Sequence, residues 1–222
     1  LMSGLGNMAE AYNVPVQSHL SENHGEIDWV AALHPEAANY TDVYYEHHLM
    51  GKVPTVMAHC IHLSDVEMDL MAETQTMVSH CPYSNVNLSS GIAPIRKLFE
   101  RKIPIGLGSD ISGGHIVSMA KVLTEAIGLS KMKWVEVDQT YAPLTLSEAF
   151  YMATKGGGKF FGKVGSFEKG CELDALVIDD TTLFDPNERS LEERLERWLY
   201  IGDDRHIVER YIAGKVAPEP TN

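Results

Sequence analysis

Four short apolar runs, each followed by a helical pattern, constrain the fold of this chain more than any other feature. The runs are VPVQSHL (14–20), TVMAHC (55–60), TMVSHC (76–81) and IPIGLGSD (103–110). Helical patterns follow near residues 22–34, 64–73, 92–101 and 114–130. Strands that alternate with helices in this way form βα units and a parallel sheet. The sequence therefore predicts an α/β fold.

The spacing of the runs favours a particular α/β architecture. The polar residues near the ends of the runs, His19, His59, His80 and Asp110, are separated by 40, 21 and 30 positions. A (β/α)₈ barrel uses roughly 30 residues for each βα unit. The longer first gap has room for an extra helix, which TDVYYEHHL (41–49) suggests. Four such units are expected to form half of a TIM-type barrel.

The same polar residues are candidates for chemistry. In a parallel barrel the carboxyl ends of the strands converge on one mouth, where the active site lies. Histidine and carboxylate ligands from different strands suit a catalytic zinc ion that keeps one position open for water. Glu22 follows His19 by three residues, so its carboxylate is expected to face the same mouth.

Each of these residues also has a structural interpretation. A single histidine at a strand end is often a hydrogen-bonded packing residue, and Glu22 could simply stabilise the positive end of a helix. Four polar strand ends together favour a functional site. The remaining histidines fall in helical or loop contexts and are expected to lie mostly on the surface: His24, His34, His47, His48, His62, His115 and His206.

Composition excludes several classes of partner. The formal net charge of −13 argues against nucleic acid and anionic membranes, which both attract basic surfaces. The apolar runs are too short to span a membrane. The three cysteines, Cys60, Cys81 and Cys171, form no CxxC pair, so neither a disulfide framework nor a cysteine-based zinc site is expected. A reducing cytoplasm is therefore the predicted compartment.

The pattern changes after residue 130. A helix is expected from Thr145 to about Lys155, then a turn and strand in GSFEKGCELDALVIDD, a helix in LEERLERWL (191–199) and a strand in IVERYIAGKV. We expect a barrel region in residues 1–160 and a second region in residues 161–222. The chain end from Pro218 onward is expected to be frayed.

Several motifs resemble the metal-dependent amidohydrolase superfamily, and within it the branch that deaminates guanine. QSHLSEN (17–23), MAHC (57–60), SHCPYSNVNLSSG (79–91) and GLGSDISGG (106–114) carry this resemblance. It continues through LTLSEAFYMATKGG (144–157), GSFEKGCELDALVI (165–178) and WLYIGDDRHIVERYIAGK (198–215). The motifs therefore extend over nearly the whole chain, and the GDDRxI tail is the one most particular to the guanine-deaminating branch.

The resemblance implies a role for each candidate residue. His19 and Asp110 would be metal ligands from the fifth and eighth barrel strands, with His59 from the sixth as a possible third ligand or a contact to the hydrolytic water. Glu22 would shuttle protons and, like His19, contact the substrate. His80, Ser84 and Asn85 would line the substrate pocket. The metal would be one zinc ion per subunit, or else iron.

The resemblance also implies that parts of such an enzyme lie outside this sequence. The superfamily pattern includes an HxH metal pair on the first strand, and no HxH occurs here. The chain also begins at Leu1 with no initiator methionine. We therefore expect the C-terminal half of the barrel, together with the C-terminal part of a small β-sandwich. The sheet edges should pair with strands from an N-terminal half, and the assembly is expected to be a homodimer.

The implied activity is zinc-dependent hydrolysis of guanine to xanthine and ammonia, with guanine and water as the partners. A related deaminase that acts on 8-oxoguanine, a triazine or an adenosine derivative remains an alternative. A catalytically silent scaffold is a further alternative from a different class. The presence of His19, Glu22, His59 and Asp110 together argues against the silent scaffold.

Overall fold

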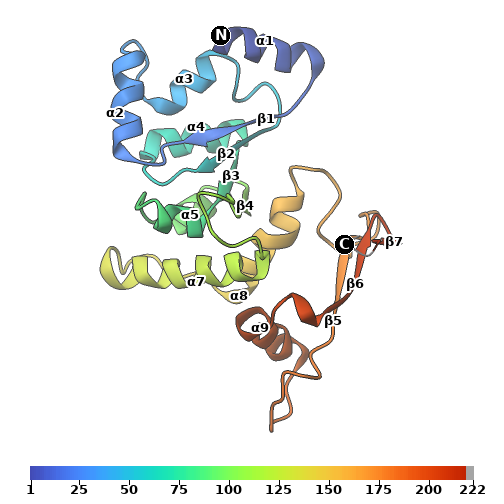
Figure 1. Cartoon of the computed structure of the whole chain (residues 1–222). Helices are drawn as coiled ribbons and strands as arrows, with labels where there is room; N and C mark the ends of the chain where they lie inside the picture. The colour runs from blue at the N-terminus through green and yellow to red at the C-terminus, as the bar shows by residue number, and fades with distance from the viewer. Residues whose placement is uncertain (219–222) are drawn as a thin grey trace.

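The computed structural model describes residues 1–218. Its central element is a sheet of four strands: β1 (Val16–Leu20), β2 (Thr55–His59), β3 (Met77–His80) and β4 (Ile105–Leu107). All three pairings are parallel, and the spatial order is β1-β2-β3-β4 (Figure 1). The predicted parallel sheet is confirmed. Within the described residues, neither β1 nor β4 pairs with a further strand along its outer edge.

Helices connect and flank these strands. They are α1 (Met2–Tyr12), α2 (His24–Leu33), α3 (Tyr40–Glu46), α4 (Asp65–Thr74), α5 (Pro82–Asn87), α6 (Ile95–Glu100), α7 (Met119–Glu136), α8 (Leu146–Tyr151) and α9 (Leu191–Ile201). A π-helical turn at Met152–Gly156 extends α8, and a 3₁₀ turn at Asp204–His206 follows α9. The extra helix expected near residues 41–49 is α3.

Local sequence explains where several helices begin. Ser64, Thr145 and Ser190 each precede a helix, and each side chain accepts a hydrogen bond from the backbone N–H three residues later. A glutamate at that third position accepts a hydrogen bond in turn from the backbone N–H of the capping residue. This capping box satisfies N–H groups that have no partner inside the helix, and a cap contributes about 1 kcal/mol.

The core lies on one face of the parallel sheet. Leu20, Met57, Val78 and Ile105 are each at most 1% exposed, and they belong to one apolar cluster with side chains of α4, α6, α7 and α8. Burial of a side chain of this size contributes roughly 1.5–3 kcal/mol. The helices on this face therefore hold the strands in place, and the strand ends lie at one edge of the layer.

Three predicted boundaries are wrong. The strand expected at 103–110 covers only Ile105–Leu107, because the chain turns at residues 108–114. The helix expected at 114–130 is α7, which begins after this turn and ends at Glu136. The helix expected at 92–101 covers only α6, and a separate helix that we did not expect, α5, forms at Pro82–Asn87.

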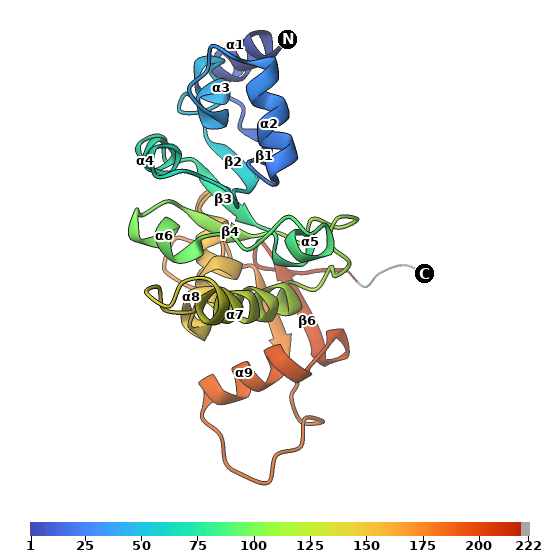
Figure 2. The ribbon, with the colours of Figure 1, turned by 90° about the vertical axis from the view of Figure 1, so that its left-hand side faces the viewer.

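A second, antiparallel sheet lies toward the other end of the molecule. It consists of β5 (Ala175–Ile178), β6 (Ile207–Ile212) and β7 (Lys215–Val216) in the order β5-β6-β7. The run IVERYIAGKV is thus a hairpin and not one strand. Figure 2 shows the elongated shape of the chain, with α1–α3 at one end and α9 at the other.

Two further expectations concern the surface and the chain end. The sequence predicts His206 at the surface, but only 8% of the residue is exposed. His206 ends the 3₁₀ turn, where its Nδ1 accepts a hydrogen bond from the Asp203 amide at 3.1 Å. Of the predicted frayed end, residues 219–222 lie outside the described part of the chain.

Among residues 1–218, no helix has the length and apolar character needed to cross a membrane.

Candidate active site

The backbone turns sharply where β1 and β2 end and just beyond β4. Ser21, His59, Cys60 and Asp110 all have positive φ, between 45° and 69°. The left-handed region disfavours non-glycine residues, and such strain tends to cluster at functional sites. The same turns place polar groups at the carboxyl end of the sheet. This edge of the sheet is therefore the candidate active site.

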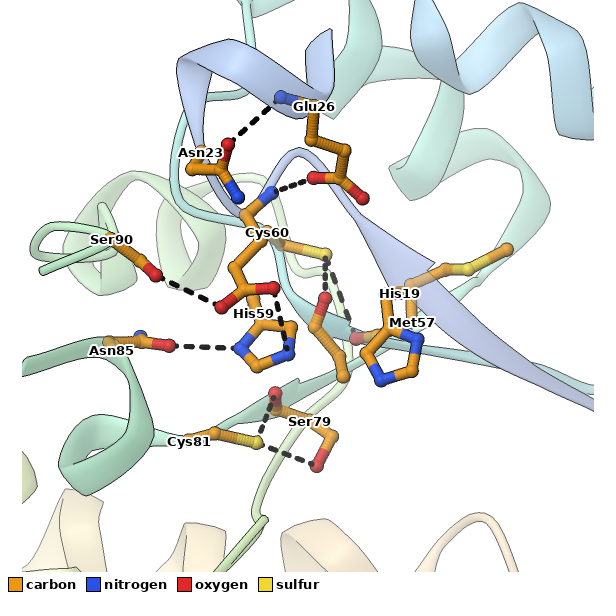
Figure 3. A network of polar contacts seen from close by, with 12 residues as sticks. His19, Asn23, Glu26, Met57, His59, Cys60, Ser79, Cys81, Asn85 and Ser90 are labelled. Carbon is orange, nitrogen blue, oxygen red and sulfur yellow. Dashed lines mark hydrogen bonds and ion pairs between the residues drawn. The ribbon is translucent and has the colours of Figure 1, made fainter. Parts of the chain in front are cut away.

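His19 and His59 meet at this edge. Their rings stack with centroids 5.4 Å apart and planes at 17° (Figure 3). In the β1–β2 register His59 pairs with Leu20 and not with His19, so strict alternation would place the two imidazoles on opposite faces. The left-handed backbone at His59 ends this alternation. His19 is exposed, whereas His59 is buried.

His59 has a polar neighbour at each ring nitrogen. Its Nδ1 lies 3.0 Å from Oδ1 of Asn85, and its Nε2 lies 3.8 Å from Oε2 of Glu22. An amide oxygen only accepts, so Nδ1 carries the proton that it donates to Asn85. In the neutral ring Nε2 then has a free lone pair that faces Glu22.

Glu22 is held at its side chain and at its backbone. Ser90 Oγ donates to Oε1 of Glu22 at 2.9 Å, from the far end of the segment that follows β3. The Glu22 amide donates to Oε2 of Glu26 at 2.8 Å, and Tyr40 donates to the other oxygen of Glu26 at 2.9 Å. In Figure 3, dashed lines mark the contact from Ser90, the contact between Asn85 and His59, and the contact of Glu26 with the Glu22 amide. The Glu22 carboxylate is therefore ordered beside His59.

Asp110 lies on a turn of its own. It lies three residues beyond the end of β4, where its carbonyl accepts from the Gly114 amide. Gly113 approaches so closely that a Cβ there would lie 2.6 Å from Asp110 Oδ2 and 2.7 Å from Ser84 Oγ. The lack of a side chain at Gly113 thus allows this loop to close over Asp110.

His80, Ser84 and Asn85 are all buried, with at most 1% of each residue exposed. His80 continues the core face of β3, and it borders a small apolar cavity of about 40 Å³ between α6 and α7. Burial, with a smaller contribution from His59, lowers the pKa of His80 to about 3. His80 is therefore neutral near neutral pH. The expected contact of these three residues with a substrate stays a prediction.

The predicted metal ligands are not assembled into one group. Among residues 1–218, no three or more His, Cys, Asp or Glu side chains gather closely enough to hold a metal ion. The donor chemistry still suits zinc, since two imidazoles lie side by side at adjacent strand ends and a half-buried carboxylate follows β4.

Two features of the site were not expected from the sequence. Ser90 contacts Glu22 from 68 positions away, and Asn85 faces His59 from 26 positions away. Both residues are in the motif SHCPYSNVNLSSG, so the motif carried a signal of function. No local pattern, however, indicates which side chain a serine in a loop contacts.

A parallel βα sheet whose strand ends carry imidazoles and a carboxylate is typical of barrel enzymes that place their active site at this edge. The model of one such family, the Amidohydrolase family, matches residues 1–217. The chain belongs to the Amidohydrolase family.

Several proteins that this chain is similar to are guanine deaminases. The chain is 42% identical over 221 residues to the guanine deaminase of Dictyostelium discoideum, a match that covers 96% of this chain and 49% of that protein. The crystal structure of a guanine deaminase from C. acetobutylicum with bound guanine has 52% identity and a TM-score of 0.94, over 97% of this chain and 51% of the other. The E. coli guanine deaminase structure has 36% identity and a TM-score of 0.88, over 99% and 52%. The chain thus spans about half the length of these relatives.

Proposed function

We propose that this chain carries part of the active site of a guanine deaminase, which hydrolyses guanine to xanthine and ammonia. The observation that carries the proposal is the ordered pair of Glu22 and His59 beside His19, at the carboxyl end of a parallel sheet. The relatives with 36–52% identity whose names or structures concern guanine support the choice of substrate.

Glu22 is the proposed proton carrier. Guanine is a poor electrophile at C2 until a ring nitrogen accepts a proton, so Glu22 would take a proton from the attacking water and pass it to N3 as the water oxygen bonds to C2. The second proton of the water, on the new C2 hydroxyl, would pass through Asp110 and Glu22 to the amine. C2 then keeps the oxygen as a carbonyl, the C2–N bond breaks and ammonia leaves. A carboxylate held by Ser90 at 2.9 Å is suited to this role because it starts in a fixed orientation.

The proposed roles of His59 and Asp110 follow from the chemistry of an imidazole and a carboxylate. Nε2 of a neutral His59 ring can accept a hydrogen bond and so orient the attacking water. Asp110 would take the second proton of this water, from the hydroxyl on C2. Proton transfer by a positioned side chain is typically worth about 10²–10⁴ in rate.

We propose one zinc ion as the cofactor, held by His19 and Asp110 with His59 as a possible third ligand; iron would suit the same donors. Such a metal supplies one thing to the reaction, a lower pKa for water near the substrate. A catalytic zinc usually takes three protein ligands. We therefore propose that an HxH pair from outside these 222 residues completes the set.

The sheet edges support the same proposal. Parallel strands are normally buried and paired on both sides, and open edges favour aggregation. Strands from an N-terminal half would pair with β1 and β4 and close the barrel. In the small sheet, Leu176, Val208 and Ile212 expose more than half of their surface, which fits the predicted β-sandwich if further strands cover them.

The test is an assay of the full-length gene product. Ammonia release should be measured with guanine, 8-oxoguanine, a triazine and an adenosine derivative, alongside metal analysis of the purified protein. We expect turnover of guanine above the other compounds and about one metal ion per subunit. Preference for another heterocycle would replace guanine as the substrate, and no turnover of any compound would contradict the proposed reaction.

A further inference from the structure

We propose that the segment after β3, residues 81–91, positions both catalytic side chains: Asn85 fixes the ring of His59 and Ser90 fixes the carboxylate of Glu22. This inference rests on the proposed function, since it gives Asn85 and Ser90 their role in that reaction. The resemblance predicts that Asn85 contacts the substrate. In this proposal Asn85 instead contacts a catalytic residue. Neither Asn85 nor Ser90 needs to touch the substrate.

Asn85 is suited to positioning because it is fully buried. It is 0% exposed, and its Oδ1 lies 3.0 Å from His59 Nδ1. This contact fixes the ring orientation and also the tautomer, since the proton must lie on Nδ1. The nitrogen that faces Glu22 is then the one without a proton. The distance from Nε2 to Glu22 Oε2 is 3.8 Å.

Ser90 performs the corresponding task for Glu22. Ser90 is 6% exposed, and its hydroxyl donates to Oε1 at 2.9 Å. Oε2 is therefore the oxygen that remains directed at His59.

The backbone joins the two contacts into one unit. The Ser90 amide donates to the Asn85 carbonyl at 2.8 Å, and the Asn85 amide donates to the Cys81 carbonyl at 3.0 Å. His62, from the β2 side, meets the Ser90 carbonyl at 2.8 Å through its Nε2. Because Glu22 follows β1 and His59 ends β2, their separation depends on this third segment. A misplacement of about 1 Å can cost roughly 100-fold in rate.

Ser90→Ala in the full-length gene product tests the contact to Glu22, with Ser89→Ala as the matched control. Ser89 is exposed, and no side-chain hydrogen bond is seen for it within residues 1–218. We expect Ser90→Ala to lower kcat for guanine about 10- to 100-fold, with KM and metal content nearly unchanged. Ser89→Ala should match the wild type. Wild-type kcat in Ser90→Ala would overturn the inference.

A double variant separates positioning from general damage. In a Glu22→Gln background no proton carrier remains to be positioned, so adding Ser90→Ala should lower kcat by less than about 2-fold further. A full additional loss would mean that Ser90 acts through the fold and would overturn the inference. Asn85→Leu should likewise lower kcat with little change in KM, whereas Asn85→Asp keeps the acceptor oxygen and should lose less.

A crystal structure of a variant tests the positioning of Glu22 separately from the reaction that the enzyme catalyses. A crystal structure of Ser90→Ala should show the Glu22 carboxylate turned away from His59, whatever substrate the enzyme uses. An unmoved carboxylate would overturn the inference even if guanine is the substrate. Conversely, a wild-type protein that does not deaminate guanine contradicts the function, while a displaced Glu22 in the variant would still support the positioning.

Discussion

The imidazoles of His19 and His59 stack with their centroids 5.4 Å apart, although the register of their strands assigns them to opposite faces of the sheet. The left-handed backbone of His59, with φ of 69°, brings the two rings to one edge. An exposed ring and a buried ring thus lie side by side, and the buried one is oriented by Asn85.

Glu22→Gln should keep its metal and lose most of its turnover. The amide has nearly the same shape but cannot carry a proton, so we expect kcat for guanine to fall about 10²- to 10⁴-fold. Ammonia release and metal content, measured on the same full-length sample, test this prediction. Asp28→Asn on the exposed side of α2 is the control. Turnover near the wild-type rate would remove the proton-carrying role of Glu22.

Asp110→Asn should lose both metal and activity. The substitution weakens a proposed metal bond and removes the base that would take a proton from water. Metal analysis of the purified variant decides between the roles. If it retains one metal ion per subunit and still deaminates guanine, Asp110 is neither ligand nor base.

His80→Ala should affect stability more than metal content. The side chain is 1% exposed and stays neutral, because burial lowers its pKa to about 3. We expect the free energy of unfolding to fall by about 1–3 kcal/mol through lost packing. His19→Ala should instead lower the metal content. Equal metal loss in both variants would show that His80 belongs to the metal site.

The ion pair of Arg96 and Glu148 should make stability depend on acid pH. Nη2 of Arg96 lies 2.8 Å from Oε2 of Glu148, and Arg96 also bonds the carbonyls of Ala142 and Pro143. The hydrogen bond from Arg96 is the main cause that lowers the Glu148 pKa to about 2. A lowered carboxyl pKa stabilises the fold above the unfolded pKa near 4.5, and this contribution is lost as pH falls toward 2.

Glu148→Gln tests this pH dependence. The variant should lose about 1 kcal/mol at pH 7, after allowance for solvent screening of a partly exposed pair. The Tm difference between wild type and variant should narrow between pH 5 and pH 3. Glu73→Gln, at an exposed position of α4, serves as control. A Tm difference that stays constant over this range would show that the charge of Glu148 contributes nothing.

Much of the fold was predictable because its signals are local. Apolar runs of strand length and helical periodicity depend only on neighbouring residues. They indicated parallel βα units and located His19, Glu22 and His59 at strand ends. The boundaries that failed were those where the chain turns for a tertiary reason, as after Leu107, where the loop closes over Asp110.

The sequence by itself determined which groups stand at the carboxyl edge of the sheet. The tertiary structure alone decided which of them meet. His80 entered the core because its position in β3 continues the buried face, while His59 left its face through a left-handed turn. Ser90 reached Glu22 across 68 positions because α5 and the strands bring distant segments together. Such contacts depend on packing between remote parts of the chain, which no local pattern of residues encodes.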